Sequence, residues 1–337
     1  MLTIINKAIL HVLDFHSGVT VFSEQELDSQ NASVATFLTK HVEKLYSDSN
    51  AQSGLFYPDS DFKGRLTAYL DGSLDFTAFS VYVGEQVYSV VSLSEILDPA
   101  DLIVCDLSIE GERFLAVLKC NNKVGFTHQV VTADGMVRND IINHYAILPS
   151  ITQKLDEYAL IDLNSLQIRF GDKKRSIDGE DIYIIPEKIL ECSSSISPKK
   201  AIDLVNTIAR KVSENHGQNA VSSVAAVSKA KNYLVENAEV SDYLNPVELG
   251  RRVFSSSPMM QDEYIKEVQQ AGIPETVKVD RALAEKKGKS HKIKTDTGIE
   301  LAFPADYFQN TDYIEFINNP DGTLSIQLKN IGKIVNS

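Results

Sequence analysis

The sequence predicts an α+β protein: an N-terminal antiparallel sheet with packed helices, then a helical segment and C-terminal β-hairpins. Apolar residues recur every three or four positions over residues 29–48, which is the period of an amphipathic helix. Over residues 101–123 they follow the two-residue period of strands. The strand-like segments come in neighbouring pairs joined by short turns. Antiparallel strands can be joined by such turns, whereas parallel strands need a long crossover connection.

Two helices and a first strand are predicted in the N-terminal third. Val34, Phe37 and Leu38 begin an apolar face that continues through residue 45, and Ser29 or Asn31 is placed to cap that helix. The apolar spacing of residues 75–91 predicts a second helix. The apolar N-terminus is interrupted by charge and has no cleavage site after it, so we expect a strand there and not an export signal.

Residues 101–123 predict two strands joined by a tight turn at Glu110 and Gly111. The strand pattern continues over residues 145–150 and 157–172, which completes the expected antiparallel sheet. Across the first pair we expect Val104, Leu107 and Ile109 to face Phe114, Ala116 and Leu118.

A domain boundary is predicted at the serine-rich stretch ECSSSISPKK, which gives domains 1–192 and 193–337. A capping residue followed by proline marks helix starts at Ser197, Asn245 and Ser257. The last fifty residues return to strand patterns, with a turn at Asp296–Gly298 and another at Pro320–Gly322.

The composition indicates a globular protein without a membrane span, because 43% of the residues are hydrophobic but no run of about 18 apolar residues occurs. The three cysteines, Cys105, Cys120 and Cys192, are far apart and odd in number. This pattern favours free thiols in a reducing cytoplasm over disulfides or a metal site.

The charge is unevenly distributed along the chain, whose formal net charge is -13. Residues 1–192 hold 15 Lys and Arg against 28 Asp and Glu, whereas residues 193–337 hold 18 of each. Within the neutral part, residues 281–294 contain six basic residues and one acidic residue. This basic segment is either a solvated surface, which is common, or a contact for a polyanion.

The tripeptide Gly288-Lys289-Ser290 resembles the end of a phosphate-binding loop. Such a loop has another glycine five positions before its lysine, and here that position is Ala284. The loop also follows a strand and opens a helix, whereas a helical pattern precedes this tripeptide and a strand pattern follows it. We therefore do not expect a nucleotide site.

A nucleic-acid contact is the stronger hypothesis for the basic segment. In a strand over residues 291–296, Lys292 and Lys294 lie on one face, about 6.6 Å apart, while Ile293 points toward a core. We expect the preceding lysines to lie on a turn around Gly288. Lysines without interleaved aromatic residues favour phosphate contact over base reading. The candidate DNA-binding residues are Arg281, Lys286, Lys287, Lys289, Lys292 and Lys294. Alternatively, the lysines only keep an edge strand soluble.

No catalytic, metal or cofactor motif emerges from the rest of the chain. None of the seven histidines forms a pair with metal-ligand spacing on one element, and no Gly-x-Ser-x-Gly sequence occurs. We therefore predict that the protein is not an enzyme, has no catalytic residues, and uses neither a metal nor a cofactor.

Over nearly its full length, the chain resembles the bacterial 37-kDa nucleoid-associated protein family. The resemblance rests on GLFYPDSDF (54–62), FLAVLKCNNKVGFTH (114–128), YAILPSITQKLDEYALIDLNSLQI (145–168), IKTDTGIELAFPADYF and FINNPDGTLSIQLKNIGKI. It implies DNA binding in the bacterial nucleoid and cytoplasmic residence. It implies no particular DNA-contacting residues.

Together these observations predict a cytoplasmic, nucleoid-associated protein involved in chromosome organisation, which binds the DNA backbone non-specifically. Its candidate protein partners are nucleoid proteins and further copies of itself. The alternative is a protein-interaction module that reaches the nucleoid without touching DNA. A third class is a nuclease that uses scattered carboxylates and Mg²⁺.

Overall fold

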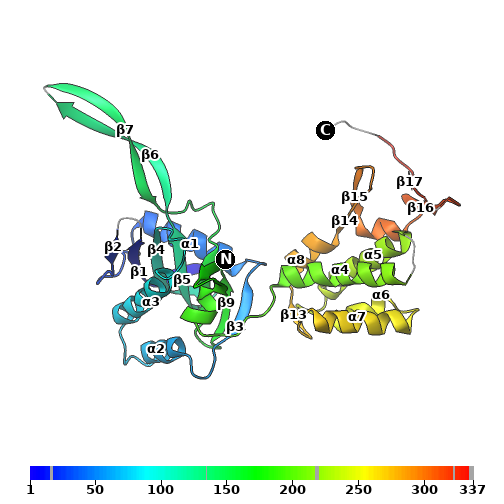
Figure 1. The fold of residues 1–337 in the computed structure, drawn as a ribbon, viewed down its shortest axis with the longest axis horizontal. Helices are drawn as coiled ribbons and strands as arrows, with labels where there is room; N and C mark the ends of the chain where they lie inside the picture. Colours follow the sequence, from blue (N-terminus) through cyan, green and yellow to red (C-terminus); the bar gives the residue numbers. More distant parts are fainter. Residues whose placement is uncertain (16–17, 134, 217–219, 322, 334–337) are drawn as a thin grey trace. The chain divides into compact units, whose positions relative to one another are not determined.

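The structure is a computed structural model that describes residues 1–15, 18–133, 135–216, 220–321 and 323–333. The chain divides into two compact units, Met1–Ser195 and Ile196–Ser337 (Figure 1). Helices and strands occur in both units, so the α+β prediction is confirmed. No described helix combines the length and the apolar character that crossing a membrane requires.

The first unit is built on a seven-stranded sheet with the strand order β2-β1-β4-β5-β8-β9-β3. Every neighbouring pair in it is antiparallel, as the sequence predicts. The strands are β1 (Thr3–Asp14), β2 (Val19–Val21), β3 (Gln52–Leu55), β4 (Ala100–Ile109), β5 (Glu112–Asn121), β8 (Glu157–Asp162) and β9 (Gln167–Gly171).

Helices cover both faces of this sheet. On one face, α1 (Ala32–Tyr46) packs its buried residues against alternate residues of β4 such as Ile103 and Cys105. On the other face, α2 (Asp61–Leu70) and α3 (Phe76–Val91) pack against Leu102 and Val104. Because both faces are covered, β4 is buried at nearly every position, including its polar residues Asp101 and Asp106.

The helix predictions for this unit are confirmed, and Asn31 caps α1 by accepting a hydrogen bond from the Ser33 backbone at 2.9 Å. The β4–β5 turn also lies where expected, at Glu110 and Gly111, with positive φ angles of 50° and 89°.

The predicted facing residues across β4 and β5 are only partly right. Leu107 faces Phe114 as expected. Val104, however, pairs with Val117 and points to the opposite face of the sheet. The error arose because a strand buried on both faces lacks the alternation that fixes register.

Three short elements complete the core of the first unit. Strands β10 (Lys174–Ile177) and β11 (Glu180–Tyr183) form a hairpin, and a π-helical turn, η1, covers Ile185–Ile189.

Strands β6 (Lys123–Ala133) and β7 (Met136–Ile147) form a separate ribbon that projects from the unit (Figure 1). The sequence analysis did not predict this ribbon.

The second unit begins with helices around one apolar core. The helices are α4 (Pro198–Asn215), α5 (Ala220–Asn237), α6 (Pro246–Val253), α7 (Pro258–Gln270) and α8 (Arg281–Gly288), and a short pair links β12 (Tyr243–Leu244) to β13 (Val277–Lys278). Ser197, Asn245 and Ser257 cap α4, α6 and α7, which confirms the three predicted helix starts.

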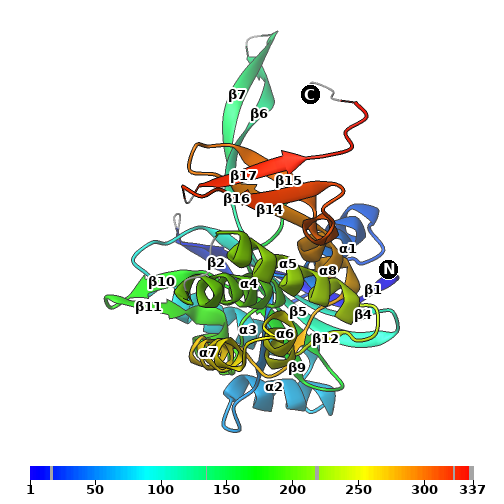
Figure 2. The same cartoon turned by 90° about the vertical axis from the view of Figure 1, so that its right-hand side faces the viewer.

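Two hairpins follow the helices, as predicted, and lie together in Figure 2. The first joins β14 (Ser290–Lys294) to β15 (Glu300–Pro304), and the second joins β16 (Ile314–Asn318) to β17 (Leu324–Leu328). A 3-10 turn, η2 (Ala305–Gln309), connects them. Phe303 and Phe316 pack with ring centroids 6.2 Å apart. The predicted turn residue Gly322 lies outside the described residues.

Candidate nucleic-acid interface

The basic segment is carried by α8 and β14, and α8 is held firmly against the helical core. Asp280 caps α8 by accepting a hydrogen bond from the Leu283 backbone at 2.8 Å. Leu283, Ala284 and Gly288 are buried. A Cβ atom at Gly288 would lie 2.4 Å from Val235 Cγ2 and 2.8 Å from the Lys231 carbonyl oxygen, so glycine permits the close approach of α8 to α5.

Lys286 and Lys287 occupy the last helical turn of α8, and Lys289 caps the end of the helix. The expectation that these lysines lie on a turn around Gly288 is therefore wrong for the first two. The helical position has a physical reason: cations near a helix C-terminus interact favourably with the exposed carbonyl dipoles.

The strand prediction for the next part of the segment is confirmed. Lys292 and Lys294 are exposed on one face of β14, whereas His291 is buried and Ile293 half-buried on the other face. The His291 ring stacks on Phe303 with centroids 5.4 Å apart. This apolar contact fixes which face of the hairpin presents its lysines to solvent.

Carboxylates of the same unit pair with four of the six candidate cations. Glu285 accepts from Arg281 Nε at 3.1 Å and from Lys289 Nζ at 2.8 Å. The Lys287 Nζ–Asp203 Oδ1 distance is 2.6 Å, and the Lys294 Nζ–Glu300 Oε1 distance is 3.1 Å. Hydrogen bonds from Lys289, and then from Arg281, hold the pKa of Glu285 below its ordinary value.

Lys286 and Lys292 are the two remaining cations. Both are exposed, and neither forms an ion pair or hydrogen bond within the part of the chain that the structure describes. The six cations and the three carboxylates that pair with them give this patch a formal charge of +3. The patch is less positive than the sequence count indicates, because folding brings Asp203 and Glu300 to it.

Sequence reasoning missed Lys231, which joins the patch from α5. Its Nζ atom donates to the Ser290 carbonyl oxygen at 2.7 Å. Burial, and then repulsion from Lys287, lowers its pKa. Lys231 lies about fifty residues before the basic segment, so no local sequence pattern connects the two.

The tripeptide Gly288-Lys289-Ser290 lies at the C-terminal end of α8, where carbonyl oxygens are unpaired. A phosphate group is bound at the opposite end of a helix, where N–H groups point outward. The geometry therefore agrees with the sequence in excluding a phosphate-binding loop here.

The sequence matches the protein family described as nucleoid-associated protein YejK over residues 9–335. The chain belongs to this family. The resemblance noted from the sequence blocks is thereby confirmed. No curated protein matches the chain closely enough to add to this finding.

In this member of the nucleoid-associated family, α6 and α7 follow each other in the chain, and α7 is the more acidic of the two. Glu267 of α7 pairs with Lys211 of α4 at 2.8 Å, and Glu263 pairs with His216 at 2.6 Å. Asp262 adds a third carboxylate to the same helix. With Lys266 as its one cation against three carboxylates, α7 has a net negative charge, which disfavours contact with DNA phosphates.

A buried ionic cluster in the first unit is the best-formed candidate for other chemistry in this family member. Glu157 lies 2.9 Å from Lys119 and 2.6 Å from Arg175, and all three side chains are nearly inaccessible. Burial alone would raise the pKa of Glu157, but Lys119 and Arg175 lower it to about 2. The cluster thus holds two cations against one shared carboxylate.

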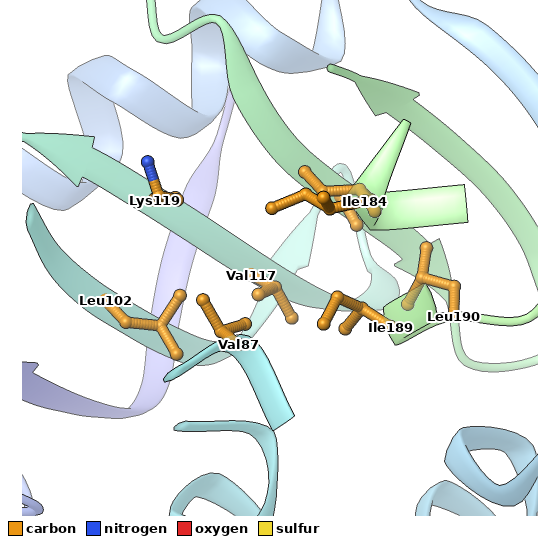
Figure 3. Close-up of a pocket in the computed structure, with 9 residues that line it drawn as sticks. Val87, Leu102, Val117, Lys119, Ile184, Ile189 and Leu190 are labelled. Atoms are coloured by element: carbon orange, nitrogen blue, oxygen red, sulfur yellow. The ribbon is translucent and has the colours of Figure 1, made fainter. Parts of the chain in front are cut away.

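The cavity beside this cluster is too small for a substrate. It has a volume of about 10 Å³, the size of one water molecule, and its lining is apolar except for Lys119 (Figure 3). Among the described residues, no group of three or more His, Cys, Asp or Glu side chains is placed to hold a metal ion. The three cysteines are free and buried, as predicted.

Proposed function

We propose that the protein binds DNA non-specifically in the nucleoid, through phosphate contacts of Arg281, Lys286, Lys287, Lys289, Lys292 and Lys294. The observation that carries the proposal is the pair of exposed cations Lys286 and Lys292. Within the described residues neither has a carboxylate partner, and both belong to a protein of a nucleoid-associated family. Lysine ammonium groups bind phosphate as point charges, and phosphate contacts carry no sequence information.

The four ion-paired cations add to this surface because their pairs are weak. The side chains of Arg281 and Lys289 are 64% and 63% exposed, and ion pairs at such exposed positions are screened by water and contribute little. A DNA phosphate therefore replaces the protein carboxylate at small cost. Lys287 contributes least, because its side chain is only 24% exposed.

The acidic first unit limits how DNA approaches. Residues 1–192 contain 13 more acidic than basic residues, so this part of the chain repels a polyanion. Binding is consequently local and of weak to moderate affinity, unlike that of basic proteins that coat DNA by bulk charge.

A gel-shift titration of the purified chain at several salt concentrations, with and without Mg²⁺, tests the proposal. Neutralising about five phosphates gives a slope of log affinity against log salt of about −4 to −5. Replacing the five lysines by glutamine should flatten that slope. The control is Lys173→Gln/Lys174→Gln, which removes two exposed cations from the first unit. A slope unchanged by the five substitutions would exclude the patch as the DNA surface.

The same titration distinguishes the other two classes. A protein-interaction module recruited indirectly leaves bare DNA unshifted at moderate salt and instead co-purifies with protein partners. A nuclease degrades the DNA when Mg²⁺ is present and stops when a chelator is added. Our proposal is of a non-enzymatic cytoplasmic protein that needs no cofactor, so it expects shifted, intact DNA in both conditions.

A further inference from the structure

One amine beside the basic patch differs from the six candidate cations in its surroundings. Lys231 of α5 is half-buried, and its Nζ atom donates a hydrogen bond to the Ser290 carbonyl oxygen at 2.7 Å, at the surface of the second unit. The end of α8 lies against its backbone, because a Cβ atom at Gly288 would come within 2.8 Å of the Lys231 carbonyl oxygen. The side chain is therefore held in one position, whereas five of the six candidate cations are exposed.

The charged groups around the Lys231 amine favour its neutral form. Burial, and then repulsion from Lys287 of α8, lower the pKa of this amine. Asp203 of α4 acts in the opposite direction, but its carboxylate is already paired with Lys287 at 2.6 Å. His291 of β14 is buried and has its pKa lowered to about 4, so it is neutral near pH 7. A desolvated lysine next to another cation is a nucleophilic amine.

The same patch attracts small anions toward this amine. Lys289 directly precedes Ser290, whose carbonyl oxygen holds the amine, and Lys292 follows two residues later. Both lysine side chains are exposed. Lysine ammonium groups bind phosphate oxygens as point charges. A small molecule that carries a phosphate group is therefore concentrated next to an amine that can react with it.

We propose that Lys231 is an acylation site whose acyl donors are acyl phosphates. The exposed lysines of the patch hold the phosphate group of the donor, and the neutral Lys231 amine attacks the carbonyl carbon of the acyl group. A C–N bond forms, and the bond between that carbon and the bridging phosphate oxygen breaks. Inorganic phosphate leaves with the electron pair of the broken bond, and the amine proton passes to solvent. The product is an uncharged amide, and the reaction uses no other reactant.

Acylation also regulates the DNA surface, and this consequence alone rests on the proposed function. The amide has no positive charge and loses the ammonium group that donates to Ser290. Lys231 lies against α8, which carries part of the proposed DNA surface, so the acylated chain has one cation fewer beside that surface. We expect its DNA affinity to fall about two- to fivefold at moderate salt.

Incubation of the full chain with acetyl phosphate at pH 7, followed by peptide mass spectrometry, tests the site. We expect Lys231 to be acetylated about threefold faster, or more, than Lys229, an exposed lysine two positions away on the same helix. Exposure alone predicts the opposite order. The ratio of the two rates should fall toward one as the pH rises through 10.5, the ordinary lysine pKa, because a lowered pKa gives no advantage there. A rate at Lys231 no higher than at Lys229, or a ratio independent of pH, would overturn the proposal.

A neutral reagent, acetic anhydride, tests the class of donor. Lys289→Gln/Lys292→Gln should slow the acetylation of Lys231 by acetyl phosphate but not by acetic anhydride, because only the first reagent carries a phosphate. Lys173→Gln/Lys174→Gln in the first unit should slow neither reaction. Equal slowing with both reagents would contradict the acyl phosphate as donor.

The mass-spectrometric readout requires no DNA, so the two proposals can fail separately. A chain that shifts DNA but is not acetylated at Lys231 loses the acylation site and keeps the proposed function. A chain acetylated at Lys231 that shifts no DNA, modified or unmodified, keeps the site and loses the proposed function. Equal DNA affinity of the acetylated and unmodified chains would contradict the regulatory consequence.

Discussion

Lys287 Nζ lies 2.6 Å from Asp203 Oδ1, and this ion pair joins the end of α8 to α4. The two residues are 84 positions apart in the chain. The pair neutralises the least exposed of the six candidate cations, so it limits how strongly this part of the patch can attract a polyanion.

Removing the carboxylate of that pair should strengthen DNA binding. Asp203→Asn frees Lys287 and removes one negative charge from the patch, which we expect to raise DNA affinity about two- to fivefold at moderate salt. Fluorescence anisotropy with a labelled duplex would measure the change. Asp178→Asn, an exposed substitution in the first unit, should leave the affinity unchanged; an equal gain there would mean that only overall charge matters.

Lys286 and Lys292, which have no ion-pair partner among the described residues, should dominate the salt dependence. Lys286→Gln/Lys292→Gln removes the two proposed phosphate contacts and should make the salt slope shallower by about 1.8, since each phosphate contributes about 0.9. Lys173→Gln/Lys174→Gln removes the same amount of charge from the first unit and should leave the salt slope unchanged. The slope of log affinity against log salt should be measured for both double variants at four salt concentrations. A change in the first variant alone assigns DNA binding to the patch, and an equal change in both assigns it to overall charge.

Glu157 should be the most stabilising carboxylate of the first unit, because two cations depend on it. Glu157→Gln leaves Lys119 and Arg175 buried without a counter-charge, and we expect it to cost about 3–5 kcal/mol of unfolding free energy. The neighbouring substitution Asp156→Asn breaks only the exposed pair with Lys173 and should cost less than about 1 kcal/mol. Urea denaturation of both variants gives the comparison.

The same residue predicts a pH dependence of stability. Its pKa is about 2 in the folded protein against an ordinary value of 4.5, so the folded state holds fewer protons between these values. Its contribution is therefore present above about pH 4.5 and is lost as pH falls toward 2. Glu157→Gln should flatten the stability curve within that window; an unaltered curve would assign the acid sensitivity to other carboxylates.

Local signals in the sequence were sufficient for much of the fold. The capping residues Asn31 and Ser197 marked helix starts because a cap acts within three residues, and Glu110–Gly111 marked a hairpin for the same reason. Register across β4 and β5 was not accessible, because a strand buried on both faces has no polar side to orient it.

The β6–β7 ribbon was missed although its signal is present. Val124, Phe126 and Val130 fall on alternate positions, and the dipeptide Asp134–Gly135 separates them from a similar run. For the basic segment the sequence identified the cations and Glu285, but the two other carboxylates that reduce its charge come from α4 and β15. Only the folded chain brings such distant residues together.

The position of α8 should depend on Gly288. In Gly288→Ala the added methyl group meets Val235 and the Lys231 backbone, so α8 has to move, and we expect a loss of about 1–3 kcal/mol of stability. The displaced helix carries Lys286 with it, so DNA affinity should fall as well.

Gly64→Ala in α2 is the matched control, because its added methyl group meets nothing within 4 Å and should stabilise the protein by about 0.5–1 kcal/mol. Thermal unfolding of the two variants, followed by anisotropy at a temperature where both are folded, separates the effect on stability from the effect on binding. A Gly288→Ala variant as stable as the unaltered protein would contradict the close packing of α8 against α5 at this position.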